Sequence, residues 1–223
     1  MGSYEDTIAV LETELAAVQR VFAGLSDGEW RLPTKLVPVD PDLPHWTVFE
    51  LAGHFDISIG LTRMLIAGAE ASQPARDRTS FFINPRSETA PVVYDYAYTM
   101  VQGKTPADMP GVLQETFSKT VAEARAVPAG TVGPGYFAPM RVDEFVASRI
   151  VEAVVHGIDL TQALGRDSIA TADGIAATAL ILDDLLARRT IPGRPAAYSD
   201  DLSWILVASG RAESGDNRLP LIG

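Results

Sequence analysis

The spacing of hydrophobic residues predicts helices along almost the whole chain. In the first segment, apolar residues recur every three or four positions, which is typical of an amphipathic helix with one buried face. They are Ile8, Leu11, Leu15, Val18, Phe22 and Leu25. Ser3 and Asp6 are residue types that cap a helix N-terminus, and they stand where this helix should start.

A second helix is predicted after a proline-rich loop. Thr47 and Glu50 form a T-x-x-E capping box in front of a new apolar stripe, and Gly68 is placed to end the helix. We expect residues 72–91 to be irregular. Further helical stripes are predicted over 91–100, from Thr105-Pro106 onward, over about 142–164, over 175–187 and over about 200–209.

These patterns predict an all-α fold. The sequence contains no sustained alternation of period two and no internal repeat. We therefore expect an antiparallel bundle of four long helices with additional C-terminal helices. The bundle should occupy residues 1–165, and residues 166–223 should form a short helical extension.

Composition narrows the function classes. The 223 residues are 47% hydrophobic and 21% charged, as in a globular domain, and the formal net charge is -11. Such an acidic chain is a poor nucleic-acid binder. No apolar run approaches the roughly 20 residues that span a bilayer. The N-terminal sequence lacks the features of a signal peptide, so we expect a cytoplasmic protein.

The candidate chemistry lies in the predicted helix over 142–164. Glu152 and His156 are four residues apart, so on a helix their side chains are only about 40° apart. Ala153 and Leu160 share this face, which indicates that the pair points inward. A buried carboxylate and imidazole need partners. A hydrogen-bonded buried pair is one interpretation, and two metal ligands are the other.

His54 strengthens the metal interpretation, although alone it could also be a histidine satisfied within the core. It is one of three histidines in the chain, and it lies near the buried stripe of the second predicted helix. His54, Glu152 and His156 would give three nitrogen and oxygen ligands with an open position. This pattern is typical of catalytic zinc and also suits nickel, iron(II) or manganese.

Four further residues stand near these candidates in the sequence. Asp159 follows His156 by three positions and could accept its second N–H, or could lie in an ordinary helix-end hydrogen bond. Arg149 precedes Glu152 by three and could orient it, bind an anionic substrate, or form a surface salt bridge. We expect His45 to be a surface histidine and Trp46 to be a packing anchor at a helix start.

Two segments resemble a known family. "LPHWTVFELAGHFDISI" resembles the second-helix signature of the DinB-like superfamily, with a histidine eight positions after a tryptophan. "SRIVEAVVHGIDLTQALG" is similar to the E-x-x-x-H-x-x-D-L segment of the mycothiol-dependent maleylpyruvate isomerase branch of that superfamily. The resemblance covers roughly residues 5–165. It implies a four-helix bundle that holds a divalent metal, usually zinc, with His54, Glu152 and His156 as its ligands.

The resemblance also implies an activity. The chain has no cysteine, so a thiol nucleophile would have to come from outside, and in this family it is mycothiol. Its thiolate would add to a small electrophilic substrate, giving either a thiol S-transferase or a cis-trans isomerase. A metal-dependent hydrolase and a non-catalytic bundle that binds a small ligand are the alternatives, and the sequence leaves a homodimer open.

The C-terminal segment departs from the family pattern. The maleylpyruvate isomerase proper carries a sizeable C-terminal α/β domain that contributes to its site, whereas residues 166–223 are predicted to be helical here. Arg211 is a candidate to clamp a substrate carboxylate, on its charge alone. We therefore expect a mycothiol-dependent metalloenzyme of this family whose substrate need not be maleylpyruvate.

Overall fold

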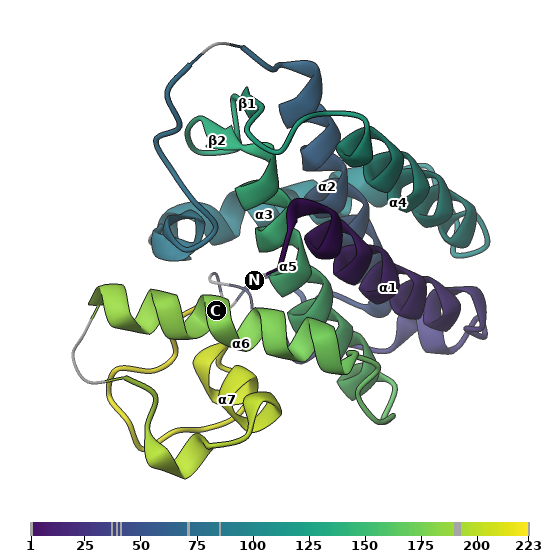
Figure 1. Ribbon diagram of the computed structural model, residues 1–223. Coiled ribbons are helices and arrows are strands. Elements are labelled where there is room, and N and C mark those ends of the chain that lie inside the picture. Colours follow the sequence, from purple (N-terminus) through teal and green to yellow (C-terminus); the bar gives the residue numbers. More distant parts are fainter. Residues whose placement is uncertain are drawn as a thin grey trace.

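A bundle of long helices forms the body of the protein (Figure 1). The computed structural model describes residues 2–222 apart from 37, 39, 41, 71, 85 and 190–192. The four helices of the bundle are α1 (Tyr4–Ala23), α2 (Val48–Ala67), α4 (Met109–Arg125) and α5 (Val142–Ala163). Helices α1 and α2 each pack against both α4 and α5. The predicted all-α class is confirmed.

The starts of α1 and α2 follow from local sequence. The Asp6 backbone N–H donates to the Ser3 hydroxyl over 3.2 Å, and the Ser3 N–H donates to the Asp6 carboxylate over 2.8 Å. Thr47 and Glu50 form the same reciprocal arrangement at the start of α2, which ends before Gly68. Both predicted caps are confirmed. They satisfy backbone N–H groups that have no partner within the helix.

Helix α3 (Arg86–Val101) packs against α2 on the outside of the bundle. The approach is close at Gly53, where a Cβ atom would lie 2.5 Å from the carbonyl oxygen of Ala97. A side chain there would push α3 away, so Gly53 sets the distance between the two helices. Gly53 directly precedes His54, and the contact therefore bears on the geometry of the site.

A short hairpin and three single turns of 3₁₀ helix connect the described helices. Strands β1 (Val132–Gly133) and β2 (Met140–Arg141) are antiparallel and lead directly into α5. The 3₁₀ turns are η1 (Glu29–Arg31), η2 (Ser80–Ile83) and η3 (Ala196–Tyr198). None of the helices in the described part of the chain is long and apolar enough to cross a membrane.

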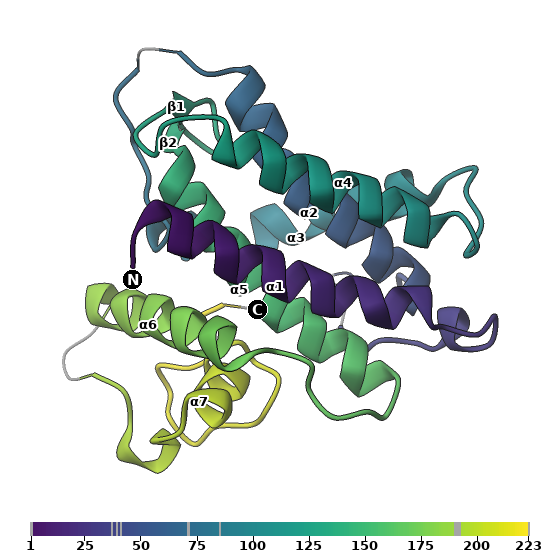
Figure 2. The same cartoon turned by 45° about the vertical axis from the view of Figure 1, so that its right-hand side comes forward.

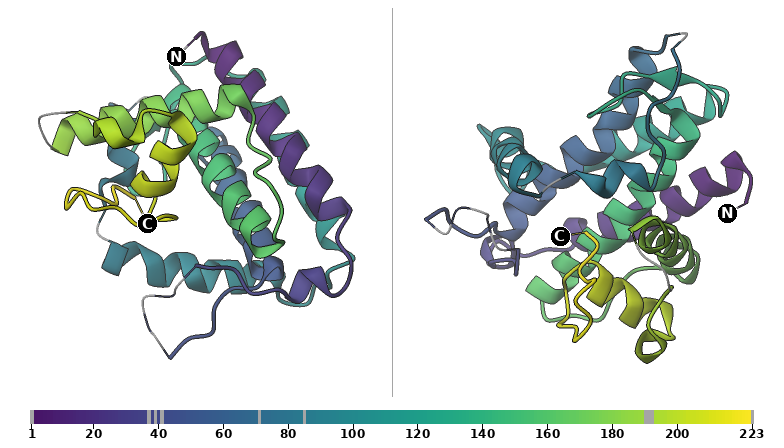
Figure 3. Two further views of the ribbon diagram at one scale, coloured as in Figure 1. Left: turned by 90° about the horizontal axis from the view of Figure 1, so that it is seen from below. Right: turned by 90° about the vertical axis from the view of Figure 1, so that its left-hand side faces the viewer.

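The C-terminal segment forms α6 (Ala172–Arg189) and α7 (Asp201–Ala208). Helix α6 packs against α5, and α7 packs against α6. Figure 2 shows α1 running between α4 and α6, and Figure 3 shows α6 and α7 gathered on one side of the bundle. Buried residues of this segment, such as Leu182 and Trp204, belong to the same apolar cluster as the bundle core. The proposed division at residue 165 stays a prediction.

Two element predictions were wrong. Residues 72–91 are not all irregular, because η2 and the first turns of α3 lie there and Pro91 sits inside α3, where proline normally argues against a helix. The helix predicted from Thr105-Pro106 begins only at Met109. The Asp108 carboxylate accepts from the Thr105 N–H over 2.7 Å and closes a turn before the helix starts.

Candidate metal centre

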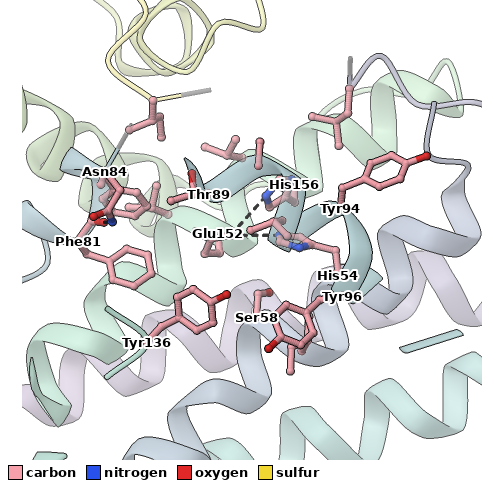
Figure 4. Close-up of a pocket in the computed structure, with 18 of the residues that line it drawn as sticks. His54, Ser58, Phe81, Asn84, Thr89, Tyr94, Tyr96, Tyr136, Glu152 and His156 are labelled. Atoms are coloured by element: carbon pink, nitrogen blue, oxygen red, sulfur yellow. Dashed lines mark hydrogen bonds and ion pairs between the residues drawn. The ribbon is translucent and has the colours of Figure 1, made fainter. Parts of the chain in front are cut away.

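His54, Glu152 and His156 meet between α2 and α5. Helix α2 carries His54, and α5 presents the other two residues one turn apart, so that one ligand atom from each residue lies within 4.8 Å of the others. The Nε2 atoms of His54 and His156 each lie 3.4 Å from Oε2 of Glu152 (Figure 4). The structure thus brings His54 to the pair Glu152 and His156, which follows it by about a hundred positions in the sequence.

Asp159 fixes the orientation of the His156 ring. Its Oδ2 lies 2.8 Å from Nδ1 of His156, and the Asp159 side chain is almost fully buried. Because a carboxylate can only accept, Nδ1 carries the proton. Nε2 is therefore the ring nitrogen that faces Glu152, and in the neutral tautomer it carries the lone pair that a metal could take.

Arg211 in turn holds Asp159. Its Nε and Nη2 atoms donate to the two carboxylate oxygens over 2.9 and 2.7 Å. Burial alone would raise the pKa of Asp159, but the Arg211 charge and the His156 hydrogen bond lower it to about 2. Arg211 therefore binds a carboxylate of this chain, in a contact that reaches from the end of α7 to α5.

Arg149 is buried, with 2% of its surface exposed, so the surface salt bridge considered for it is wrong. Its guanidinium lies between the rings of Phe81 and Phe145, with centroid distances of 4.6 and 4.5 Å. It donates to the backbone oxygen of Ser58 over 3.0 Å, and Nη2 lies 3.9 Å from Oε1 of Glu152. Arg149 is thus positioned beside Glu152 as a fixed charge.

These neighbours set the protonation of the three candidate ligands. Burial would raise the pKa of Glu152, but the two neighbouring histidines and the Arg149 charge hold it well below 4.5, so this carboxylate is ionised. Burial, with His156 alongside, lowers the pKa of His54. Burial would also lower the pKa of His156, but Asp159 and Glu152 outweigh it and raise that pKa.

The donor set fits a divalent metal. Four ligands placed about 2.1 Å from one tetrahedral centre are roughly 3.4 Å apart, which is the separation of each histidine Nε2 from Oε2 of Glu152. Hydrogen-bonded partners lie at about 2.7–3.2 Å, so 3.4 Å is long for a direct bond. Two imidazoles and one carboxylate leave a coordination position for solvent or a substrate.

A cleft of about 940 Å³ opens beside these residues. Its lining includes the aromatic residues Trp46, Phe81, Phe82, Tyr94, Tyr96, Tyr136 and Phe137, of which Phe81, Tyr94, Tyr96 and Tyr136 are labelled in Figure 4. Trp46 is buried at the start of α2, as predicted, and its ring lies 5.2 Å from that of His54. His45 is exposed, also as predicted.

Several cleft residues have no signal in the sequence. Tyr96 and Tyr136 lie in segments without a motif, and Leu221 and Ile222 reach the cleft from the C-terminal tail. The pairing of Asp159 with Arg211 joins residues 52 positions apart. These contributions depend on how segments that are far apart in the sequence pack together.

Fold and site together define a helical bundle with a two-histidine, one-carboxylate centre. Residues 11–161 match the model of the mycothiol maleylpyruvate isomerase N-terminal domain family. That match covers more than half of the chain, so this protein belongs to the family. No curated protein sequence matches the chain.

Solved structures with the same fold agree with this assignment. The chain resembles a mycothiol-dependent maleylpyruvate isomerase with a TM-score of 0.52 at 14% identity, over 84% of this chain and 69% of that one. A histidine-to-alanine mutant of a mycothiol-dependent maleylpyruvate isomerase gives 0.54 at 13% identity, with the same coverage. At this identity the likeness shows a shared fold.

Proposed function

We propose that this protein is a mycothiol-dependent metalloenzyme that adds a thiolate to a small electrophilic molecule. His54, Glu152 and His156 would hold the metal, and zinc is the expected ion because the donor set and separations suit it. Nickel, iron or manganese are compatible with the same donors. Membership of the family supports mycothiol as the thiol.

One observation carries the metal part of the proposal. Asp159 keeps one proton of His156 on Nδ1, so Nε2 is the atom that faces the ionised carboxylate of Glu152 at 3.4 Å. These two buried atoms need a cation between them, either a proton on Nε2, which the raised pKa of His156 favours in the metal-free protein, or a metal ion. A metal ion would satisfy both, together with His54.

The chemistry divides between the metal and the chain. A bound divalent metal would act as a Lewis acid that lowers the pKa of a thiol in its open position. Asp159 and Arg211 orient His156, Arg149 holds Glu152 ionised, and the aromatic walls confine the electrophile and limit water. The thiol proton would pass to solvent water in the open part of the cleft.

The reaction itself involves one new bond. The thiol sulfur bonds to an electrophilic carbon. In a cis enone, the π electrons move to the carbonyl oxygen, the former double bond rotates, and the C–S bond breaks again to give the trans isomer. Where the carbon carries a leaving group, that group departs with its bonding pair and the product is a thioether. The first outcome is an isomerase, and the second is an S-transferase.

The geometry disfavours the hydrolase alternative. A hydrolase needs a general base beside the metal, and Asp159 was the nearest candidate. Both of its oxygens are already bonded, one to Nε of Arg211 and the other to His156 and Nη2 of Arg211. Among the described residues that line the cleft, the remaining carboxylates apart from Glu152 are Asp40 and Asp95, and both are exposed.

The proposal is tested by incubating zinc-loaded protein with mycothiol and a panel of enones and aryl halides, followed by mass spectrometry. We expect adducts or isomerised products that require both metal and thiol, and poor activity with glutathione. Turnover with every thiol excluded would establish the hydrolase. Ligand binding without metal and without any product would establish the non-catalytic bundle.

A further inference from the structure

The charged residues that line the cleft suggest which electrophile it accepts. Among the described residues, three cations reach the cleft, namely Arg149, Arg189 and Arg211. The first is held between two phenylalanine rings beside Glu152, and the third is bonded to both oxygens of Asp159. Neither guanidinium is available to a substrate without breaking a buried ion pair or cation–π contact.

The remaining cation, Arg189, offers only a weak site for an anionic substrate. It is exposed, and its Nη2 is 3.4 Å from the backbone oxygen of Phe82, at the edge of the cleft. Asp40 and Asp95 are exposed residues that also line the cleft, and Glu152 is ionised beside the candidate metal position. In the metal-loaded protein, Glu152 and a bound thiolate would balance the charge of the divalent ion, so a substrate carboxylate would meet the exposed Asp40 and Asp95 and one solvated arginine.

The apolar residues of the cleft also favour an uncharged substrate over an anionic one. Leu43, Ile83 and Tyr96 line it while remaining 38%, 47% and 42% exposed. Exposed apolar residues that gather at one opening usually mark a surface that receives an apolar ligand. Deeper in, Phe81, Val155 and Leu221 continue the apolar wall toward His156.

Tyr136 adds a neutral hydrogen-bond donor. Burial raises the pKa of its phenol, which stays protonated, and among the described residues the structure shows no hydrogen bond to the hydroxyl. Figure 4 shows this side chain pointing into the cleft near Ser58 and the Glu152 cluster. A neutral phenol suits the carbonyl or nitro oxygen of an uncharged electrophile.

We propose that the second substrate of this site is an uncharged electrophile with a flat apolar body, such as an aryl enone or a nitroaryl halide, rather than a dicarboxylate. This inference rests on the proposed thiol transfer. The cleft holds the apolar body against its aromatic walls, and Tyr136 donates to the polar end. The thiol adds across the double bond, with its proton ending on the neighbouring carbon, or it replaces a halide that leaves as the hydrogen halide.

The test compares matched neutral and anionic electrophiles with the zinc-loaded protein and mycothiol. One pair is 1-chloro-2,4-dinitrobenzene and 4-chloro-3-nitrobenzoate, and another is dimethyl maleate and maleate. Each kcat/KM is divided by the uncatalysed rate with the same thiol. We expect the neutral member to be favoured about tenfold or more, because the carboxylate loses water without gaining a partner. Equal or better use of the anions would overturn the inference.

A variant pair sharpens the comparison. Tyr96→Arg places an unpaired cation on an exposed part of the wall, and Tyr96→Leu is the apolar control. The arginine variant should lower the neutral-to-anion ratio at least about threefold, while the leucine variant should keep it. An unchanged ratio in Tyr96→Arg, with equal folding by circular dichroism, would count against charge as the determinant.

A binding measurement separates this inference from the proposed function. Quenching of tryptophan fluorescence reports entry of unreactive 1,3-dinitrobenzene or 3-nitrobenzoate into the cleft beside Trp46, and Trp46→Phe corrects for Trp30 and Trp204. Tighter binding of the neutral compound supports the substrate class even if no thiol adduct forms, in which case thiol transfer alone fails. Tighter binding of the nitrobenzoate would refute the substrate class.

Discussion

The bundle and the C-terminal segment contribute to the site in different ways. All three candidate ligands come from α2 and α5 of the bundle. The C-terminal segment supplies no such ligand among its described residues, but its Arg211 holds Asp159, and its tail lines the cleft. The bundle helices thus place the donor atoms. The orientation of the His156 ring depends on Asp159, which the C-terminal segment holds through Arg211. The two regions should respond differently to mutation.

Removing a ligand from the bundle should have the largest effect. We expect His54→Ala or His156→Ala to weaken zinc binding more than about 100-fold, because even outer residues of metal sites contribute 10–100-fold. Thiol-dependent activity should vanish in parallel. Metal content is measured by elemental analysis after dialysis, with the exposed His45→Ala as the matched control. Wild-type zinc content in His54→Ala would exclude His54 as a ligand.

The next largest effect should come from the contact between the two regions. Asp159→Asn removes the carboxylate that accepts from His156, and we expect zinc affinity to fall about 10–100-fold while all three ligands remain. A competition titration with a zinc chelator measures this change. If the affinity stays within twofold of wild type, the ring orientation does not depend on Asp159, and the two regions act independently.

Arg211→Gln should show how much the same contact contributes to the free energy of unfolding. It leaves the buried Asp159 carboxylate with His156 alone, and loss of one partner of a buried pair costs about 3–5 kcal/mol of unfolding free energy. The matched control is Arg125→Gln, which breaks exposed pairs with Glu5 and Glu12 and should cost about 0–1 kcal/mol. Urea unfolding of the metal-free proteins measures both. The double variant Asp159→Asn/Arg211→Gln should recover part of the loss, and simple additivity would contradict the pairing.

Substitution of Glu14 should have the smallest effect on stability. Glu14 lies at a second contact between the bundle and the C-terminal segment. It is buried on α1, and its Oε1 accepts from the backbone N–H of Thr171 before α6 over 2.9 Å. Burial raises its pKa above 4.5 despite the hydrogen bonds to Thr171. Stability from this group is therefore highest below the unfolded-state pKa and is lost as the pH rises through the raised folded-state value.

Glu14→Gln mimics the protonated form at every pH. We expect the variant to equal or exceed wild-type stability at pH 7 and to lack the decline that wild type shows above pH 4.5. Thermal unfolding across this pH range measures the difference. A variant that is less stable than wild type at neutral pH would mean that the ionised carboxylate is the preferred partner of Thr171.

The sequence predicted those parts of the molecule that depend on local spacing. Four-residue spacing was enough to place Glu152 and His156 on one face, and capping boxes were enough to start α1 and α2. It did not predict the burial of Arg149, which depends on two phenylalanines from different segments. Nor did it predict the partner of Arg211, because that contact forms only when α7 packs on α6. Two helix starts that were predicted at prolines were also wrong. Pro91 lies within α3, and Thr105-Pro106 precedes α4 by a turn.

The separation of His54 from Glu152, 98 positions along the chain, has a consequence for biogenesis. A newly synthesised chain cannot complete the three-ligand site until α5 has emerged from the ribosome and closed a loop that spans α3 and α4. Closing such a long loop has an entropic cost that grows only slowly with length, and metal binding would offset part of it. Stable metal uptake should therefore be a late event in maturation, and chains truncated before residue 152 should not retain zinc.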